Sequence, residues 1–277
     1  MPSVFITGGS TGIGRDAGLR MSRRGWTTFV GIRSDADAES VISESDGLIT
    51  PVRCDITDAE QIAAAADQVL SITGGSLTGL VNNAGIARPG PLEVLPVADL
   101  REQLEVNVIG HVAVTQAFVD ALRNEGGRIV NIGSVSGMYG APGIGAYAMS
   151  KFALEAFNDV LRRELAPWKI SVSIIQPGSV DTPIWDKSIV ISKPLLESLD
   201  DRQRSTYGPL IKPLIRGADT PKTPVSVVTD AIEHALVDRR PRTRYPIGSS
   251  ARWITLLRRL LPDRSLDRLA RIGRDRS

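Results

Sequence analysis

The sequence predicts a single-domain α/β protein, built on a doubly wound parallel sheet that carries helices on both faces. Two observations predict this fold. Short apolar runs rich in β-branched residues alternate with longer segments of helical spacing. The length of 277 residues, with 42% hydrophobic and 23% charged residues, suits one packed domain over residues 1–277 and excludes intrinsic disorder as the main state.

Six runs are predicted to be strands, because each is brief, β-branched and bounded by turn residues. In chain order they are Val4–Ile6, Thr27–Ile32, Ile49–Arg53, Gly79–Asn82, Arg128–Ile132 and Ser171–Gln176. Helical spacing is found between them at Gly12–Arg24, Asp58–Ile72, Val97–Asn124 and Ala146–Ala166. Asp35 and Asp37 are expected to open one further helix. The crossovers between strands are expected to be right-handed.

Residues 183–224 interrupt this alternation. Six prolines lie there among apolar residues, which is too many for one long helix. They are Pro183, Pro194, Pro209, Pro213, Pro221 and Pro224. Long insertions in compact domains are often functional, so we predict a mobile cover over a site, with an ordinary surface excursion as the alternative.

The first strand runs into a glycine-rich turn, Thr7-Gly8-Gly9-Ser10-Thr11-Gly12-Ile13-Gly14, before a helix begins. Gly8 allows a tight turn, Gly12 lets a ligand approach the backbone, and Gly14 lets the helix pack against the strand. The helix N-terminus then presents free N–H groups and a positive dipole end to a phosphate. This strand–turn–helix context predicts a dinucleotide site.

The end of the second strand predicts which dinucleotide binds. An acidic residue there would hold a ribose 2′-hydroxyl, whereas a basic residue would accommodate a 2′-phosphate. The chain has Ile32 followed by Arg33 and Ser34, so Arg33 favours NADP, with NAD as the second choice. The alternative for Arg33 is a solvated cation at the strand end.

Further motifs follow in a set order. They are Asp55-Ile56, Asn82-Asn83-Ala84-Gly85, Asn107, Ser134, Tyr147-Ala148-Met149-Ser150-Lys151, Pro177-Gly178 and Thr182. With Thr7–Gly14 they resemble the short-chain dehydrogenase/reductase family over residues 3–182 and Arg244–Ile247. The resemblance implies a Rossmann-like sheet of seven parallel strands, a nicotinamide cofactor and a catalytic set of Asn107, Ser134, Tyr147 and Lys151. Gly133 departs from the pattern, because the family often has a serine there.

The chemistry of these residues agrees with that implication. Tyr147 and Lys151 are four residues apart, so they share one face of a helix. A nearby ammonium and a positive nicotinamide ring would lower the tyrosine pKa from its usual value of about 10, so that Tyr147 could exchange a proton with an alcohol or carbonyl oxygen. Ser134 would hydrogen-bond the same oxygen. The resemblance adds that Lys151 holds the ribose hydroxyls and that Asn107 binds a water linking Lys151 to solvent.

The glycine turn, the resemblance and the apolar cover together predict the residues that contact the ligands. Cofactor contacts are expected from Gly8, Ser10, Thr11, Gly12, Ile13, Gly14, Arg33, Ser34, Asp55, Ile56, Asn83, Ala84, Gly85, Tyr147, Lys151, Pro177, Gly178, Val180 and Thr182. Substrate contacts are expected from Ser134, Met138, Tyr147 and Trp185. No metal site is expected.

The predicted substrate is a lipophilic alcohol or ketone of the steroid, retinoid or fatty-alcohol kind. Apolar residues of the insertion, such as Trp185 and Ile191, suit such a ligand, and Leu161–Gln176 and Arg242–Tyr245 are similar to the retinol and hydroxysteroid dehydrogenase branch. The alternatives are a reductase of carrier-bound acyl groups and a non-catalytic nucleotide-sensing protein. The intact catalytic set argues against a sensor, and the absence of a reading motif argues against nucleic-acid binding.

Location is predicted from cysteine usage and from apolar runs. The single cysteine, Cys54, cannot form an internal disulfide, and neither a secretory signal nor a spanning segment is visible. We therefore expect a cytoplasmic protein, and we also expect a homo-oligomer.

The C-terminal region is strongly basic. Between Arg239 and Ser277, twelve arginines against three aspartates give a net charge of +9, which leaves −7 for residues 1–238. Residues 248–277 are expected to form a basic amphipathic extension. Its apolar side would hold Trp253, Ile254, Leu256, Leu257, Leu260 and Leu261, continued by Leu266, Leu269 and Ile272, and its polar side would hold Arg252, Thr255 and Arg259. The extension could dock on its own body, on a second subunit or weakly on a membrane surface.

Overall fold

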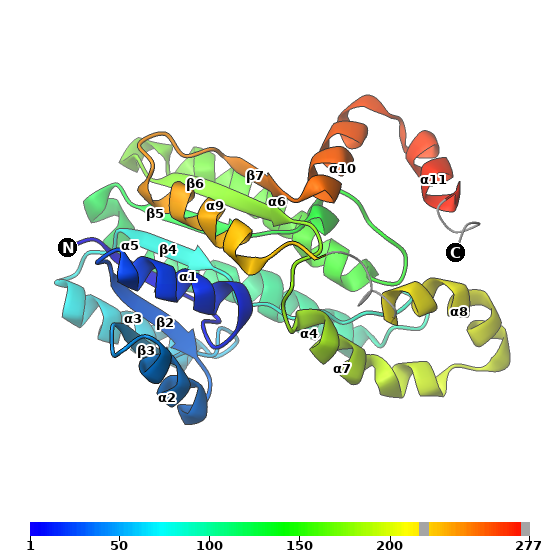
Figure 1. The fold of residues 1–277 in the computed structure, drawn as a ribbon, viewed down its shortest axis with the longest axis horizontal. Helices are drawn as coiled ribbons and strands as arrows, with labels where there is room; N and C mark the ends of the chain where they lie inside the picture. Colours follow the sequence, from blue (N-terminus) through cyan, green and yellow to red (C-terminus); the bar gives the residue numbers. More distant parts are fainter. Residues whose placement is uncertain (216–221, 273–277) are drawn as a thin grey trace.

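The computed structural model describes residues 1–215 and 222–272, which form one parallel sheet between two layers of helices (Figure 1). Its seven strands lie in the order β3-β2-β1-β4-β5-β6-β7. They are β1 (Ser3–Ile6), β2 (Thr27–Ile32), β3 (Ile49–Arg53), β4 (Gly79–Asn82), β5 (Arg128–Ile132), β6 (Ser171–Pro177) and β7 (Arg244–Ile247). The predicted strands are confirmed. The order reverses between β1 and β4, which places a crevice at the carboxyl ends of these strands.

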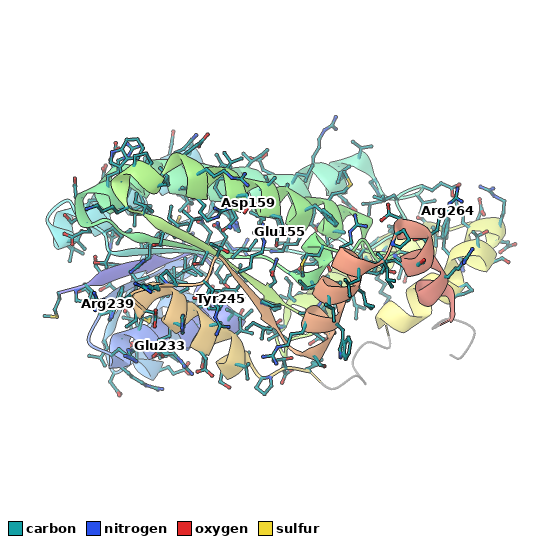
Figure 2. All side chains as sticks on the ribbon, turned by 90° about the horizontal axis from the view of Figure 1, so that it is seen from above. Glu155, Asp159, Glu233, Arg239, Tyr245 and Arg264 are labelled. Carbon is teal, nitrogen blue, oxygen red and sulfur yellow. The ribbon has the colours of Figure 1, made fainter. Side chains whose placement is uncertain are left out.

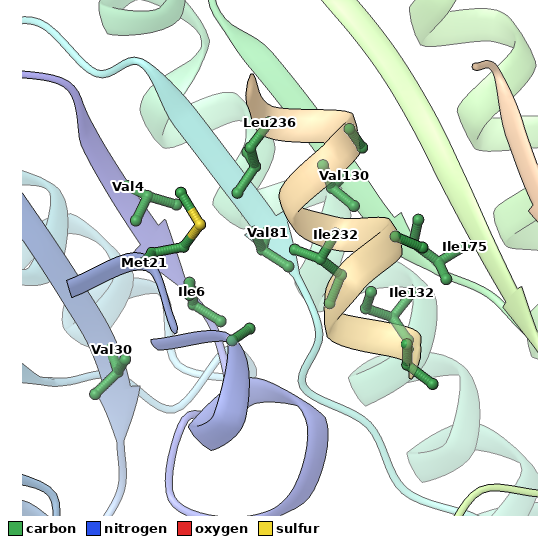
Figure 3. Packing of buried hydrophobic residues seen from close by; sticks show 14 of the residues in the cluster. Val4, Ile6, Met21, Val30, Val81, Val130, Ile132, Ile175, Ile232 and Leu236 are labelled. Atoms are coloured by element: carbon green, nitrogen blue, oxygen red, sulfur yellow. The ribbon is translucent and has the colours of Figure 1, made fainter. Parts of the chain in front are cut away.

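Buried apolar side chains hold a layer of helices against each face of the sheet. One layer contains α1 (Gly12–Arg23), α2 (Asp35–Glu44) and α9 (Val225–Val237), and the other contains α3 (Ala59–Thr73), α5 (Gly110–Glu125) and α6 (Gly145–Glu164). Figure 3 shows Ile232 and Leu236 of α9 packing on strand residues such as Val81 and Val130. Strands covered on both sides explain why the runs read as continuously apolar.

The long helix predicted at Val97–Asn124 is divided into three pieces. These are α4 (Val97–Leu104), a π-helical turn (Glu105–Ile109) and α5. Gly110 sits where a side-chain carbon would come within 2.6 Å of the carbonyl oxygen of Ile56, so the helix can approach the end of β3 only because this residue is glycine. The π turn contains Asn107, and such turns are frequent at functional sites.

The insertion at 183–224 is largely helical rather than a loop. It forms α7 (Ile184–Ser198) and α8 (Asp201–Ile215), which break at Leu199, and Pro221 lies outside the described residues. Pro194 lies inside α7 and cannot donate to the carbonyl of Val190. Val190 is 71% exposed, so water can replace the missing donor. Prolines therefore limit the length of these helices without preventing them.

The C-terminal extension forms two helices, α10 (Ser249–Leu260) and α11 (Asp263–Ile272). Trp253, Leu256 and Leu260 are exposed, whereas Thr255 faces the body with its Oγ1 3.4 Å from Met138 Sδ. Ala251 is fully buried where α10 meets the body of the protein, and its small side chain lets the helix approach closely. The side chains of Arg259, Leu269 and Ile272 lie outside what the structure describes.

Candidate active site

A cavity of about 440 Å³ opens at the carboxyl ends of the strands. The segments following β1 to β6 line it, together with α6 and the start of α7. Of the predicted residues it is lined by Gly8, Ser10, Thr11, Gly12, Ile13, Arg33, Asp55, Ile56, Asn83, Ala84, Gly85, Asn107, Ser134, Tyr147, Lys151, Pro177, Gly178, Val180, Thr182 and Trp185. Residues far apart in the sequence therefore meet around one space of the size that small-molecule sites have.

The glycine turn is held open by the segment that follows β4. Gly8 and Gly12 have φ values of +65° and +59°, which side-chain-bearing residues rarely adopt. Asn83 Nδ2 donates to the carbonyl oxygens of Thr7 at 2.9 Å and Gly8 at 3.0 Å. Thr7 Oγ1 accepts from the backbone N–H groups of Asn83 and Ala84. Asn83 thus satisfies turn carbonyls, which leaves the turn and the N-terminus of α1 facing the cavity.

Three predicted contact residues do not line the cavity. Gly14 packs behind the turn, where a side-chain carbon would lie 2.4 Å from both Gly8 O and Asn83 Nδ2. Ser34 caps α2, with its hydroxyl accepting from Asp37 N and donating to the Asp37 carboxylate. Met138 lies between β6 and α10, with Sδ 3.5 Å from Gln176 Nε2. Each of these residues is engaged within the protein and none lines the cavity, so their ligand contacts stay predictions.

Tyr147, Ser134 and Lys151 meet in the buried part of the cavity. They are 8%, 6% and 4% exposed. Lys151 Nζ donates to the carbonyl oxygen of Ile132 at 2.8 Å and lies 5.5 Å from the centre of the Tyr147 ring. The ring of Trp185 meets that of Tyr147 edge-on, with 5.4 Å between their centres. The arrangement brings a proton donor, a hydroxyl and a cation together under an apolar wall.

Burial dominates the acid–base properties of this group. It raises the pKa of Tyr147 to about 12, against the smaller lowering effect of the Ser134 hydrogen bond. It also lowers the pKa of Lys151 to about 8. The predicted lowering of the tyrosine pKa is therefore not a property of the chain by itself, because desolvation outweighs the Ser134 hydrogen bond. Tyr147 holds its proton at neutral pH, as a proton donor to a carbonyl must.

Asn107 has a structural environment that fully engages its side chain. Its Oδ1 accepts from Ile86 N at 2.9 Å, and its Nδ2 donates to Ile86 O at 3.0 Å and Ser150 Oγ at 3.1 Å. Ser150 and Ile86 were not predicted as part of the site. Asn107 ties the segment after β4 to α6, so a water relay through this residue would have to use its backbone.

His111 is a further residue that the sequence reasoning missed, although it lies one helical turn after Asn107. It is completely buried, and its Nε2 lies 2.7 Å from the carbonyl oxygen of Ala84. Because a carbonyl can only accept, Nε2 must carry the proton. Burial and the nearby Lys151 charge lower the pKa of His111 to about 3. The imidazole is thus neutral and supports a backbone segment that lines the cavity.

Replacing His111 with Gln is expected to reduce the acid sensitivity of folding. Below the ordinary pKa of 6.5, the unfolded chain binds a proton that the folded His111 does not bind until about pH 3. The free energy of unfolding therefore falls as the pH drops, by about 2 kcal/mol between pH 6.5 and pH 5. His111→Gln should lose that part of the fall, while its amide can still donate to Ala84. Urea unfolding of both proteins at pH 7 and pH 5 measures how much the free energy of unfolding falls.

The second histidine of the chain provides the control. His234 lies on α9, away from the cavity, and its ring contacts the Tyr245 hydroxyl. His234→Gln is measured in the same way as the comparison, because it removes an imidazole that is exposed to solvent. A His111→Gln protein whose stability falls between pH 7 and pH 5 as steeply as that of the native protein would contradict the assignment.

Comparison with known proteins identifies the family. A protein-family model described as short chain dehydrogenase matches residues 2–189 of the chain. The chain belongs to the short-chain dehydrogenase family. It is 36% identical over 270 residues to "Uncharacterized oxidoreductase YbbO" of Escherichia coli (strain K12), a match that covers 96% of this chain and 93% of that protein. This short-chain dehydrogenase is therefore an oxidoreductase of a family that uses NAD or NADP.

Two mammalian relatives and one solved structure extend the comparison. The short-chain dehydrogenase is 36% identical to retinol dehydrogenase 5 of Mus musculus, over 95% of this chain and 86% of the relative. It is 35% identical to 17-beta-hydroxysteroid dehydrogenase type 6 of Rattus norvegicus, over 98% of this chain and 88% of the relative. A short chain dehydrogenase from Burkholderia cenocepacia, solved in complex with NADP, is 26% identical, with a TM-score of 0.74 and coverage of 96% and 94%.

Proposed function

We propose that this short-chain dehydrogenase transfers hydride between NADP and the alcohol or carbonyl carbon of a lipophilic substrate of the retinoid, steroid or fatty-alcohol kind. The observation that most supports this proposal is the apolar wall of the cavity beside Tyr147. Ile184, Trp185 and Ile191 line the cavity there, and Trp185 packs against the Tyr147 ring. The names of the retinol and hydroxysteroid dehydrogenase relatives point to the same class of substrate.

The buried group divides the chemistry between its members. Tyr147 donates a proton to the oxygen during reduction and accepts one during oxidation. Ser134 hydrogen-bonds that oxygen and stabilises negative charge as it develops. Lys151 holds the ribose hydroxyls, and Asn107 anchors the segment after β4 beside it. The nicotinamide supplies or accepts the hydride when bound.

A substrate panel tests the proposed class. All-trans-retinol, a hydroxysteroid, a long-chain alcohol and an acyl group on a carrier thioester are compared by kcat/KM with each cofactor. Turnover of one of the free lipophilic compounds at a much higher kcat/KM than the carrier-bound acyl group supports the proposal. Preference for the carrier-bound group would replace it with the acyl-reductase alternative.

Arg33 supports the choice of NADP. It lines the cavity, its side chain is 73% exposed, and its guanidinium lies 3.9 Å from the Asp55 carboxylate. An exposed pair of this kind is weak, so Arg33 can turn to a 2′-phosphate at little cost. Arg33→Ala is expected to raise the Kd for NADP about ten- to hundred-fold while changing the Kd for NAD little, because only NADP carries the extra phosphate.

Titration calorimetry with both cofactors measures this effect. Arg53→Ala is the matched control, because Arg53 ends β3 beside the same edge, pairs with Asp35 and does not line the cavity. Arg53→Ala should leave the Kd values for NADP and NAD near those of the native protein. Equal weakening of NADP and NAD by Arg33→Ala would contradict the role, and tighter native binding of NAD would reverse the cofactor preference.

Exposed residues on α6 support a homo-oligomer. Met149, Phe152 and Val160 are 45%, 42% and 47% exposed and share one face of the helix. An apolar stripe of this kind is typical of an interface between subunits. Sedimentation velocity of the full chain tests the assembly.

Cytoplasmic location remains a prediction from the sequence.

A further inference from the structure

The helix α10 is attached to the rim of the active site by one face. Ser250 packs so closely on Gly178, which lines the cavity, that a side-chain carbon at Gly178 would lie 2.4 Å from Ser250 Oγ. Ala251 is completely buried and Thr255 contacts Met138. The start of α10 is thus fixed relative to the catalytic residues.

The opposite face of α10 carries large apolar side chains into solvent. Trp253, Leu256 and Leu260 are 63%, 46% and 68% exposed, and they lie on successive turns of the same side. We call these three residues the outer stripe. A solvated helix would carry polar residues at such positions, so the stripe is suited to an apolar surface outside the described fold.

Arginines accompany the outer stripe along α10 and α11. Residues 249–272 contain six arginines and two aspartates, a formal charge of +4. Arg252, Arg264 and Arg268 are exposed, and Arg258 pairs with Asp263. Figure 2 shows Arg264 on the tail, at the opposite end of the molecule from Arg239. The basic tail is therefore two separate regions, of which only the second accompanies the apolar stripe.

We propose that α10 and α11 dock on an anionic lipid bilayer, with the outer stripe inserted into the interface and the arginines on the headgroups. Exposed tryptophan and leucine beside arginine is the composition of interfacial helices. A lipid surface accommodates both the apolar stripe and the charge, whereas symmetric pairing of two such tails would bring like charges together. Among the described helices none is long and apolar enough to cross a bilayer, so this contact is peripheral.

The position of the tail gives this contact a role, which rests on the proposed function. Figures 1 and 2 both place α7 and α8 at the same end of the molecule as α10 and α11. Ile191 of α7 lines the cavity yet is 42% exposed, and its neighbour Val190 is 71% exposed. Docking through the outer stripe would bring this apolar edge of the cavity toward the bilayer, from which a lipophilic substrate could enter.

Vesicle co-sedimentation of the full chain tests the docking. Vesicles of phosphatidylcholine with phosphatidylglycerol are compared with vesicles of phosphatidylcholine alone, at low and at high salt. We expect binding to the anionic vesicles at low salt and release at high salt. The variants W253S/L256S/L260S and R252Q/R264Q/R268Q should each lower the bound fraction about ten-fold or more, through lost apolar burial and lost charge respectively.

The control variant I42S/L48S/I72S removes three apolar residues that are similarly exposed, at 45%, 57% and 56%, near α2 and α3. It should bind as the native chain does. Absence of native binding to anionic vesicles, or equal binding by the stripe variant, overturns the proposal. Self-association that the stripe variant abolishes, without vesicle binding, would assign the stripe to a second copy instead.

Turnover of a water-soluble ketone, measured on the same proteins, separates this inference from the proposed function. None of the substituted residues lines the cavity, so turnover of that ketone should be native. Vesicle binding without turnover of any lipophilic compound would reject the proposed substrate and leave the docking intact. Turnover of a lipophilic compound without vesicle binding would reject the docking and leave the proposed substrate intact.

Discussion

Replacing Tyr147 with Phe is expected to lower kcat by about 10²–10⁴ while leaving the Kd for the cofactor near native. The hydroxyl is the group that exchanges a proton with the substrate oxygen, and Phe cannot do so. The ring can keep its edge-on contact with Trp185, so the wall of the cavity should survive. Steady-state kinetics on an accepted substrate, with calorimetric cofactor binding, measures both quantities.

Tyr139→Phe is the matched control for this substitution. Tyr139 lies in the segment between Ser134 and α6, but it does not line the cavity. It should retain native turnover. If Tyr147→Phe kept near-native kcat, proton transfer by Tyr147 would be excluded, whereas loss of cofactor binding together with kcat would indicate a structural effect.

Replacing Gly14 with Ala is expected to destabilise the fold by about 3 kcal/mol and to weaken cofactor binding at least about ten-fold. The new carbon would lie 2.4 Å from both Gly8 O and Asn83 Nδ2, so the hydrogen bond between these two atoms has to open. The glycine turn would then lose the support that holds it toward the cavity. Urea unfolding and cofactor titration measure the two effects.

Gly208→Ala provides the comparison for Gly14→Ala. Gly208 lies within α8 and has open space where the new carbon would be. The free energy of unfolding of the Gly208→Ala protein should therefore be unchanged or slightly higher. Native stability of Gly14→Ala would show that the turn adapts, and would contradict the packing role assigned to this glycine.

The predictions succeeded where short-range pattern decides the structure. Alternating apolar runs and helical segments predicted the strands, and the turn predicted after the first strand is formed with positive φ values at Gly8 and Gly12. The order of motifs brought Asn83, Ser134 and Tyr147 to one cavity. In a parallel sheet, residues after each strand meet at one edge, so position in the sequence is enough to gather them.

Tertiary structure decided the contacts of residues that had several possible partners. Met138 lies close in sequence to Ser134 but turns to Gln176 and Thr255, which come from β6 and α10. Thr255 lies against Met138, whereas Trp253, Leu256 and Leu260 of the same helix are exposed and Ala251 is completely buried. Nothing local to either residue specifies these partners.

The sequence by itself determined the sheet, the glycine turn and the order of the catalytic residues, since these depend on backbone preference and on spacing along the chain. Only the tertiary structure decided which face of α10 is exposed, that His111 is neutral, and that burial raises the pKa of Tyr147. Those properties depend on how completely other segments exclude water from a side chain. Desolvation is set by the packing of residues distant in sequence, which no local pattern contains.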